Sequence, residues 1–580
     1  MLVLRRLRVI RTAAEPPRWA RRFHTLTTAL VGVALLLVVL RSGYGLITAP
    51  LLIAAIVGFQ FLVLGVFVFD VALGFATAVS RLDHLRKRWY DLALIVPITF
   101  AVAAGGTGIT FVILRQFLVL IQGFTRSRYF AGFIERMRLQ PVRLLALSFL
   151  GLIVVGTLLL TFPAATRDGS VTGLITALFT ATSAACVTGL VVVGTPHHWS
   201  TFGQLVIMGL FQLGGLGIMT FSAGMGVMLG RRLGLGERRT VSDIIGESRD
   251  TDIARILRYV VTVVFTVELI GAVLLFIRFL PAHPRWTDAL WHAAFHSVSA
   301  FCNAGFSLYP DSLVRFQTDL PTGAVFMMLI LLGGLGFAVV GELFNRNTIR
   351  HGPLHSLRRL SVHARLVLAT SAALVLAGTV AFFFAEYDRS LSALTTGPRL
   401  LAALFQSVSV RTAGFNTVTL GALHPVTLFL WAALMFVGAS PGGTGGGIKT
   451  TTLAILVLSV RNRILGREDV TLGRRAIPGG VVYRAAAIAA VAAGIVVIAF
   501  ALLLITERAP FERLLFETFS AFGTVGLTTG LTAELSVPGR LILVALMYVG
   551  RVGPLTLALA MRPRSSRVAI GYPAARVMAG

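Results

Sequence analysis

The sequence FTATSAACVTGL occupies residues Phe179–Leu190, and its pattern returns three times further along the chain. The later copies read FHSVSAFCNAGF (Phe295–Phe306), FQSVSVRTAGF (Phe405–Phe415) and FETFSAFGTVGL (Phe516–Leu527). Each copy begins with phenylalanine and carries a glycine before its last residue, ten residues after the phenylalanine in three copies and nine in the third. Four copies of one pattern indicate an internal repeat, with one structural unit around each copy.

The composition assigns these units to a membrane. Of 580 residues, 56% are hydrophobic and only 13% are charged, which leaves too little polar surface for a water-soluble protein of this size. Apolar runs such as Leu144–Phe162, Tyr259–Phe279 and Ala485–Ile505 approach or exceed the roughly 20 residues that a helix needs to cross a bilayer. We therefore expect many membrane-spanning helices.

Each repeated segment lies between two apolar helices and is too short to cross the membrane by itself. We predict a re-entrant helix that enters the membrane and returns through a non-helical stretch. Non-helical backbone at membrane depth is tolerated only where it is buried in protein or lines water. The four segments together therefore predict a single pore.

The predicted fold class is all-α: a polytopic membrane protein with four M1–pore helix–M2 repeats around one pore and an N-terminal four-helix transmembrane module. The predicted boundaries are the N-terminal module at 1–140, pore repeats at 141–230, 231–345, 346–462 and 463–565, and a cytoplasmic tail at 566–580. The module has candidate spans near 26–48, 51–79, 90–102 and 107–123, so that about twelve spans result in all. An ion pair between Asp70 and Arg115 suits this module better than a voltage sensor, which needs several arginines on one helix. Asp91 stands at the start of its third span.

The net charge of +28 comes from short basic segments between the apolar runs rather than from one continuous face, which argues against nucleic-acid binding. Arginines cluster between the repeats, at 231–258, 346–365 and 461–484. Short cytoplasmic loops are enriched in Lys and Arg. We therefore predict that these loops and the N-terminus face the cytoplasm and that the pore segments enter from outside.

The glycine turns that end the four segments are the predicted ion-binding site. A cation that leaves water needs oxygen ligands, and a ring of backbone carbonyls held in extended turns provides them. Glycine permits such a backbone shape, and four matching copies favour this role over simple helix packing. The predicted filter residues, with K⁺ as the metal ion, are Val187, Thr188, Gly189, Leu190, Asn303, Ala304, Gly305, Phe306, Thr412, Ala413, Gly414, Phe415, Thr524, Val525, Gly526 and Leu527.

A glycine-rich stretch, VGASPGGTGGGIKTT at Val437–Thr451, interrupts the second apolar helix of the third repeat. A phosphate-binding loop would need lysine directly after its last glycine, whereas Ile448 separates Gly447 from Lys449 here. A movable plug beneath the filter fits better, and Arg551 in the last apolar helix would add an electrostatic barrier. The predicted gate residues are Gly442, Gly443, Thr444, Gly445, Gly446, Gly447, Lys449 and Arg551.

We predict structural rather than functional roles for the cysteines and histidines that lie in apolar segments. Cys186 and Cys302 have no metal-ligand companions nearby, so neither a disulfide framework nor a zinc site is indicated. His292 and His296 lie in a pore-helix segment and are predicted to make local hydrogen bonds. We predict no catalytic residue and no cofactor besides the transported ion, and hence not an enzyme.

Six motifs together carry a family resemblance: LFTATSAACVTGLVVV, FQLGGLGIMTF, FCNAGFSL, RTAGFNT, SPGGTGGGIKTTT and the late GRVG. Over roughly 140–565 the chain resembles the Trk/Ktr/HKT superfamily of potassium transporters, and most closely its KtrB-type membrane subunits. In that family each turn gives one glycine to the filter, which corresponds here to Gly189, Gly305, Gly414 and Gly526. The family's gating loop corresponds to the broken helix of the third repeat, and its pore arginine to Arg551.

The resemblance implies potassium uptake across the plasma (inner) membrane, a homodimer, and a cytoplasmic ring of nucleotide-binding regulatory subunits of the KtrA/TrkA type. A serine in the first turn accompanies sodium transport in some plant members, so Gly189 favours potassium. The N-terminal four-span module departs from the family pattern, because a typical KtrB-like subunit begins near the first repeat. Two alternatives stay open: a sodium or weakly selective cation transporter, and a membrane enzyme that uses the glycine-rich segment for phosphate.

Overall fold

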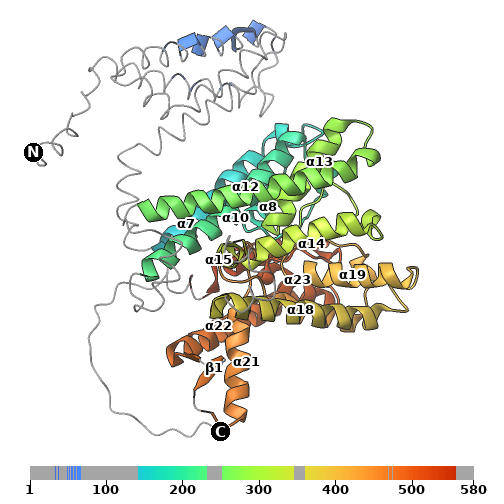
Figure 1. Cartoon of the computed structure of the whole chain (residues 1–580). Helices are drawn as coiled ribbons and strands as arrows, with labels where there is room; N and C mark the ends of the chain where they lie inside the picture. Colours follow the sequence, from blue (N-terminus) through green and yellow to red (C-terminus); the bar gives the residue numbers. More distant parts are fainter. Residues whose placement is uncertain are drawn as a thin grey trace, which may run out of the picture. The chain divides into compact units, whose positions relative to one another are not determined.

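A computed structural model describes residues 141–230, 251–344, 360–467, 469–472, 475–554 and 556, together with scattered positions between 30 and 69 (Figure 1). The predicted spans at 26–48 and 51–79 are described at those scattered positions only, and the described positions from 51 to 69 are helical. The predicted spans at 90–102 and 107–123 lie outside the described residues. So do Asp70, Asp91, Arg115 and the predicted tail at 566–580.

The chain divides into two compact units. The first comprises Met1–Leu139 and Phe162–Thr172, and the short helix η2 (Pro163–Ala165) belongs to it. The second comprises Gln140–Thr161 and Gly173–Gly580, and it holds all four repeated segments. The rest of this description concerns the second unit.

Each repeat consists of an M1 helix, a shorter pore helix and an M2 helix. The M1 helices are α7 (Pro141–Leu160), α12 (Thr251–Phe279), α18 (Val362–Glu386) and α22 (Gly479–Thr506). The pore helices are α8 (Leu174–Ala185), α13 (Trp286–Cys302), α19 (Thr396–Ser409) and α23 (Phe511–Gly523). The M2 helices are α10 (Thr201–Gly230), α14 (Leu320–Leu335) with α15 (Phe337–Leu343), α20 (Pro425–Phe436) with α21 (Thr450–Ile464), and α25 (Val537–Val552). Short connecting helices are α9 (Thr195–His198), η3 (Leu280–Ala282), η4 (Val314–Phe316), η5 (Leu420–Ala422) and α24 (Leu531–Glu534).

Three of the four M2 elements begin with proline in the first turn, where its missing N–H costs nothing and its fixed φ suits a helix. Asp319 stands directly before α14 and accepts hydrogen bonds from Thr322 and from Arg278 of α12, the latter at 3.0 Å. Partial burial opposes ionisation of Asp319, but these two hydrogen bonds outweigh it and lower the pKa of the carboxyl. The pair ties the end of M1 to the start of M2 in the second repeat.

The M2 elements of repeats two, three and four are interrupted. Between α14 and α15 the chain bends by 113° at Gly336, whose φ of 86° suits glycine. Between α20 and α21 the glycine-rich segment leaves the helix altogether, and α25 stops at Gly553, with φ 91°. The sequence predicted only the break in the third repeat, because the other two glycines stand in stretches that read as ordinary close-packing motifs.

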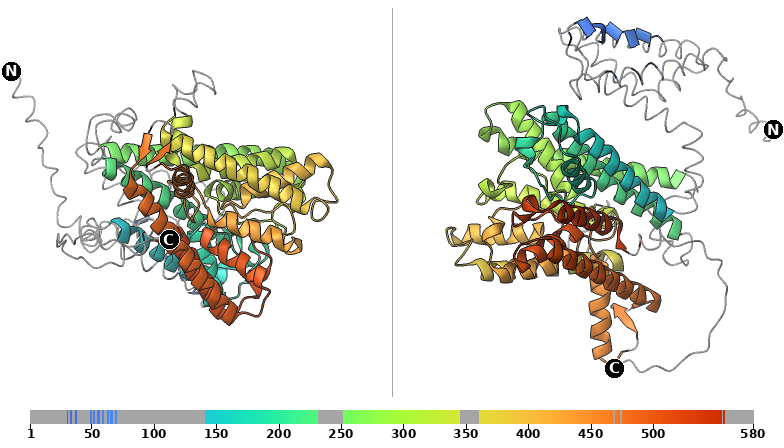
Figure 2. Two further views of the ribbon diagram at one scale, coloured as in Figure 1. Left: turned by 90° about the horizontal axis from the view of Figure 1, so that it is seen from below. Right: turned by 180° about the vertical axis from the view of Figure 1, so that it is seen from behind.

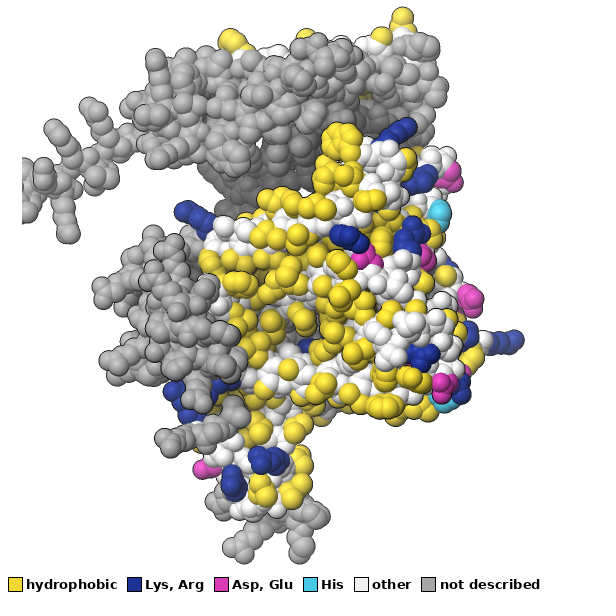
Figure 3. All heavy atoms as spheres, turned by 45° about the vertical axis from the view of Figure 1, so that its right-hand side comes forward, with side chains coloured by type: hydrophobic (Ala, Val, Ile, Leu, Met, Phe, Trp, Pro, Cys, Tyr) yellow, Lys and Arg dark blue, Asp and Glu magenta, His cyan; other side chains and the backbone are white. Residues whose placement is uncertain are grey.

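Among the described residues, five helices are long and apolar enough to cross a membrane, or six if α14 and α15 count as one span. These are the four M1 helices and α10, whereas the interrupted M2 elements fall short of the length required. Apolar side chains cover most of the face in Figure 3, and charged ones lie mainly along its right-hand edge and lower end. Exposed side chains such as Leu150, Val154 and Leu158 on α7 would face lipid. The predicted class, an all-α polytopic membrane protein, is confirmed.

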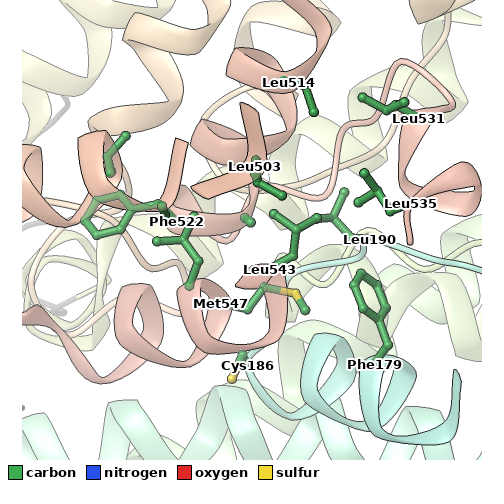
Figure 4. Packing of buried hydrophobic residues seen from close by; sticks show 14 of the residues in the cluster. Phe179, Cys186, Leu190, Leu503, Leu514, Phe522, Leu531, Leu535, Leu543 and Met547 are labelled. Atoms are coloured by element: carbon green, nitrogen blue, oxygen red, sulfur yellow. The ribbon is translucent and has the colours of Figure 1, made fainter. Parts of the chain in front are cut away.

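The interior between the first and fourth repeats is packed by apolar side chains from several helices, among them α8, α22, α23 and α25 (Figure 4). Phe179 and Cys186 of the first pore segment meet Leu543 and Met547 of α25, and Leu503 of α22 packs behind them. Close packing of this kind fixes the pore helices against the M1 and M2 helices, so the turns that follow them are held by a rigid frame.

A small antiparallel hairpin, β1 (Val470–Leu472) with β2 (Arg475–Ile477), follows α21 and was not predicted from the sequence. Helix α21 projects from the other helices together with this hairpin, as Figures 1 and 2 show. Arg461 and Arg463 lie in the last turn of α21, where cations favour the helix dipole.

Candidate functional site

The four repeated glycines meet in a ring. A β-carbon built on Gly189 would lie 3.0 Å from Cα of Gly305, one on Gly305 would lie 3.0 Å from Cα of Gly414, and one on Gly414 would lie 3.4 Å from Cα of Gly526. One on Gly526 would lie 2.9 Å from Cα of Gly189, which closes the ring in chain order. All four glycines also have positive φ values, from 69° to 93°, a backbone conformation that residues with a β-carbon rarely adopt.

Backbone carbonyl oxygens lie next to the ring glycines. The oxygens nearest to the built β-carbons belong to the residue before each neighbouring glycine: Thr188, Ala304, Ala413 and Val525. The predicted filter residues are buried or nearly so, and they converge from four segments that are far apart in sequence. Carbonyl dipoles grouped in this way can replace the hydration shell of a cation.

The pore helices add a favourable electrostatic field. All four end just before a ring glycine, at Ala185, Cys302, Ser409 and Gly523. The carboxyl end of a helix carries a partial negative charge, and it acts strongly where water is excluded. Four such ends directed at one ring favour a cation there over an anion.

A serine braces each turn, and the sequence prediction missed it. Ser183 accepts a hydrogen bond from the Gly189 amide, and Ser520 accepts one from the Gly526 amide, both at 3.1 Å. In the other two repeats the hydroxyl donates instead to the carbonyl after the glycine: Ser299 to Phe306 at 2.8 Å, and Ser409 to Phe415. The signal was present, because all four quoted segments have serine four residues after their phenylalanine.

The missing residue of the third copy therefore lies between its serine and its glycine. Helix α19 ends at Ser409 itself, whereas the other pore helices continue for two or three residues beyond their serine. Arg411 occupies the shortened turn and is buried, with its guanidinium 3.4 Å from the carbonyl oxygen and from the hydroxyl of Ser371 in α18. The third turn is thus held differently from the other three.

The glycine-rich loop, Val437–Lys449, lies against this site. The Gly446 amide donates to the hydroxyl of Thr524 in the fourth turn at 2.9 Å, and the Thr444 amide donates to the carbonyl of Gly333 in α14 at 3.0 Å. The loop starts and ends on a bridge between Val437 and Ile448. It therefore touches the filter turns and a neighbouring M2 helix while both of its ends remain in the third repeat.

Two basic side chains hold the loop. Arg551 donates to the Thr444 carbonyl and, at 2.7 Å, to the Gly214 carbonyl of α10, so it joins the first and fourth repeats to the loop. Lys449 donates to the Gly445 carbonyl at 2.7 Å. The predicted gate residues are thus brought together, and a cavity of about 210 Å³ adjoins them, lined by Gly442, Gly447, Lys449 and Arg551 among others.

Other polar residues have structural partners. His296 lies 2.7 Å from the His292 carbonyl through Nδ1, and its Nε2 accepts from the Leu308 amide at 3.2 Å, which confirms the predicted local hydrogen bonds for His296. For His292 the prediction is not met at Nδ1, which is buried without a hydrogen-bond partner among the described residues. Cys186 and Cys302 are buried free thiols. Glu517 of α23 is fully buried and accepts hydrogen bonds from Thr528, Thr529 and Thr532, which fixes the chain beyond the fourth turn.

Four pore repeats around a glycine ring are the architecture of a polytopic membrane protein that transports cations. The family model TrkH, described as cation transport protein, matches residues 106–568. The chain belongs to this family, which consists of transport proteins and not of enzymes. The match begins inside the predicted N-terminal module, before the region of resemblance seen in the sequence.

Named relatives support the same family. The chain is 40% identical over 441 residues to the Ktr system potassium uptake protein B of Vibrio alginolyticus, covering 76% of this chain and 94% of the relative. The protein of the same name from Bacillus subtilis is 37% identical over 449 residues, covering 77% and 98%. The potassium/sodium uptake protein of Enterococcus hirae is 36% identical over 452 residues, covering 77% and 98%.

A solved structure shares the fold. The crystal structure of the potassium transporter TrkH from Vibrio parahaemolyticus superposes with a TM-score of 0.59 at 18% identity, over 82% of this chain and 96% of that chain. The likeness at this identity concerns architecture alone. The predicted membership of the Trk/Ktr potassium transporters is confirmed by the family model and the relatives.

Proposed function

We propose that this chain is a potassium uptake pathway with a carbonyl filter built on Gly189, Gly305, Gly414 and Gly526. The observation that carries the proposal is the closed ring of these glycines, with carbonyl oxygens between them and four helix carboxyl ends directed at it. Two close relatives named as potassium uptake proteins support the choice of ion. The driving force is the inside-negative membrane potential, which contributes ~2.3 kcal/mol per charge per 100 mV.

The glycine-rich loop is the proposed gate. It contacts filter turns and the M2 helices of other repeats, and it is pinned by Arg551 and Lys449 through backbone carbonyls. Glycines give the loop the conformational freedom to leave this position. Displacement of the loop would open the path, and loss of the Arg551 contact would favour displacement.

The assembly belongs to the same proposal. A homodimer in the plasma membrane, with the N-terminus in the cytoplasm, would carry cytoplasmic nucleotide-binding regulatory subunits of the KtrA/TrkA type. Arginines near the ends of M2 elements support this orientation, because α21 carries Arg461 and Arg463 in its last turn and Arg467 follows it. Such subunits would act by moving the M2 elements that hold the loop.

Ion competition tests the proposal. Cells that lack their own potassium uptake systems would express the full chain, and tracer uptake of ⁸⁶Rb⁺ would be measured against excess K⁺ or Na⁺. Potassium selectivity predicts strong inhibition by K⁺ and weak inhibition by Na⁺. The reverse order would assign the chain to sodium, and equal inhibition would assign it to weakly selective cation transport.

Sodium is the second candidate because of one relative. The Enterococcus hirae protein, 36% identical to this chain, is named as a potassium/sodium uptake protein. Measuring ²²Na⁺ uptake in the same cells distinguishes the two ions: a transport signal that K⁺ does not suppress would favour sodium over potassium.

A further inference from the structure

Four side chains, one from each repeat, precede the ring glycines. They stand two residues before each ring glycine, at Val187, Asn303, Thr412 and Thr524, and we call them the pre-glycine layer. All four have positive φ, from 50° to 81°, which is costly for valine and threonine and less so for asparagine. The chain accepts this cost at the same place in every repeat, so the direction of these side chains matters to the site.

Thr524 touches the loop directly. Its hydroxyl accepts a hydrogen bond from the Gly446 amide at 2.9 Å, and both residues are buried. A β-carbon built on Gly446 would lie 2.6 Å from that hydroxyl and 2.8 Å from the Thr524 methyl group. The loop backbone therefore rests on Thr524 with no space between them.

Thr412 and Asn303 extend the contact around the ring. A β-carbon on Gly445 would lie 2.7 Å from Cβ of Thr412, so the next loop residue rests on the third turn. The Asn303 amide donates to the Ala300 and Ile330 carbonyls and accepts from the Thr412 hydroxyl at 3.1 Å. The second, third and fourth turns are thereby joined to one another or to the loop.

Val187 is the exception. Its side chain packs against α10, 3.0 Å from a β-carbon built on Gly214, and the carbonyl of Gly214 accepts from Arg551. The first turn thus reaches the loop only through α10 and Arg551. One hydrogen bond, from Gly446 to Thr524, and one packing contact, of Gly445 with Thr412, connect the ring to the loop directly. Asn303 reaches the loop through Thr412, and Val187 reaches it through α10 and Arg551.

We propose that Thr412 and Thr524 are positioning residues that couple the glycine ring to the loop, so that the docked loop keeps the ring in its potassium-selective geometry. The proposal rests on the proposed function and adds a linkage to it. Linkage between two sites is reciprocal, so an ion in the ring also favours the docked loop. The transported ion is therefore a ligand that regulates its own gate.

A double-mutant cycle on the purified full-length chain tests the coupling. The readout is the apparent dissociation constant for K⁺ and for Na⁺, taken from ion-dependent protection against thermal unfolding. Thr524→Val removes the hydroxyl that accepts from Gly446, and deletion of Gly443–Gly446 removes the loop contact. We expect each change to weaken K⁺ binding about fivefold, as the loss of one hydrogen bond would, with little change for Na⁺.

The variant that combines both changes shows whether Thr524 acts through the loop. If Thr524 acts through the loop, the double variant binds K⁺ no more weakly than either single variant, whereas independent effects would multiply to about twenty-five-fold and overturn the coupling. Thr524→Ser keeps the hydroxyl and should restore the original affinity. Thr379→Val, which removes a buried hydroxyl bonded only to its own helix at Val375, should leave K⁺ binding unchanged.

The same measurements distinguish a failure of the coupling from a failure of the proposed function. If the loop deletion raises flux but leaves K⁺ affinity unchanged, the coupling is wrong and the filter and gate stand. If neither K⁺ nor Na⁺ protects the unaltered chain and no flux is measured, the proposed function itself fails. Should Thr524→Val not fold, Thr412→Val and Thr412→Ser enter the same cycle.

Discussion

At the scale of single residues, the ring glycines are places where a side chain has no room. Each faces the backbone of the next repeat rather than a flexible side chain, so nothing can move aside to admit a methyl group. The serines behind the ring have the complementary role. They satisfy backbone groups of turns that are buried away from water, where an unpaired amide would be costly.

Replacing Gly305 with alanine should reduce ⁸⁶Rb⁺ uptake by at least about tenfold, because the left-handed backbone and the Ala413 carbonyl both oppose a β-carbon. Uptake by cells that lack other potassium systems measures the effect. Gly151→Ala is the matched control, since a β-carbon there meets nothing within 4 Å, and it should transport normally. Normal uptake by Gly305→Ala would remove this glycine from the filter.

Replacing Ser520 with alanine leaves the buried Gly526 amide without its acceptor, at a cost of about 1–3 kcal/mol. We expect the fourth turn to relax and the preference for K⁺ over Na⁺ to fall about tenfold in the competition assay. Ser148→Ala is the control, because that hydroxyl bonds only to the Leu145 carbonyl of its own helix. An unchanged preference would show that the serine is dispensable for the filter.

Arg551→Ala should raise flux several-fold, since it removes the hydrogen bond to the Thr444 carbonyl of the loop and the hydrogen bond that fixes the guanidinium to α10. Arg551→Lys retains the charge without the planar fork of donors, and it should lie between alanine and arginine. Tracer efflux from liposomes containing each variant measures this. A fall in flux with a correctly folded Arg551→Ala variant would assign the arginine to structure rather than to the barrier.

At the scale of elements, the M2 helices determine how the repeats differ. The first is continuous, the second bends at Gly336, the third opens into the loop, and the fourth stops at Gly553. The loop contacts α14 through the Thr444 amide, and its carbonyls are held from α25 by Arg551. Movement of any of these elements would therefore disturb the loop.

Deletion of Gly443–Gly446 should leave the pore permanently leaky, because the stretch that touches Thr412, Thr524 and Gly333 is then absent. Passive ⁸⁶Rb⁺ efflux from liposomes should rise about tenfold or more, in proportion to the closed fraction of the unaltered chain. Unchanged efflux would exclude the loop as the gate. Correct assembly of the deletion variant is checked by its elution as a single species in detergent.

The sequence predicted much of this arrangement and missed some of it for identifiable reasons. Glycine and proline are strong local signals, so the ring glycines and the broken third-repeat helix could be assigned from residue type alone. The break at Gly336 was missed because LGGLGF reads equally as a packing motif. Left-handed φ at Thr524 has no signal in the residue type, because threonine rarely adopts it. The bracing serines were visible in the repeats, but their hydrogen bonds depend on how each turn folds back onto its helix.

At the scale of the whole molecule, the four repeats of one chain enclose one glycine ring. Four repeats of the same plan contribute to the ring in chain order, yet only the third carries the loop and only the fourth carries Arg551. The apolar exterior and the buried polar centre suit a bilayer around the molecule and water or ions within it. The proposed passive pathway needs no chemical energy from within the chain.

Purified protein in liposomes should therefore accumulate ⁸⁶Rb⁺ without ATP. Liposomes filled with KCl and diluted into low K⁺ become negative inside as K⁺ leaves, and a potential of 100 mV supports an accumulation ratio of about fifty. Protein-free liposomes, and liposomes diluted into the same KCl concentration that they contain, so that no potential forms, are the controls. A requirement for ATP or for a proton gradient would contradict passive transport.

The presence of the loop in a single repeat has a consequence for kinetics. A channel assembled from four identical subunits opens after several independent movements, and its current rises with a delay. In the proposed mechanism one stretch of chain, whose two ends meet at the bridge between Val437 and Ile448, is the single gate of its path. After a sudden activating signal, current through each pore should rise as a single exponential from the first instant, without partly open levels.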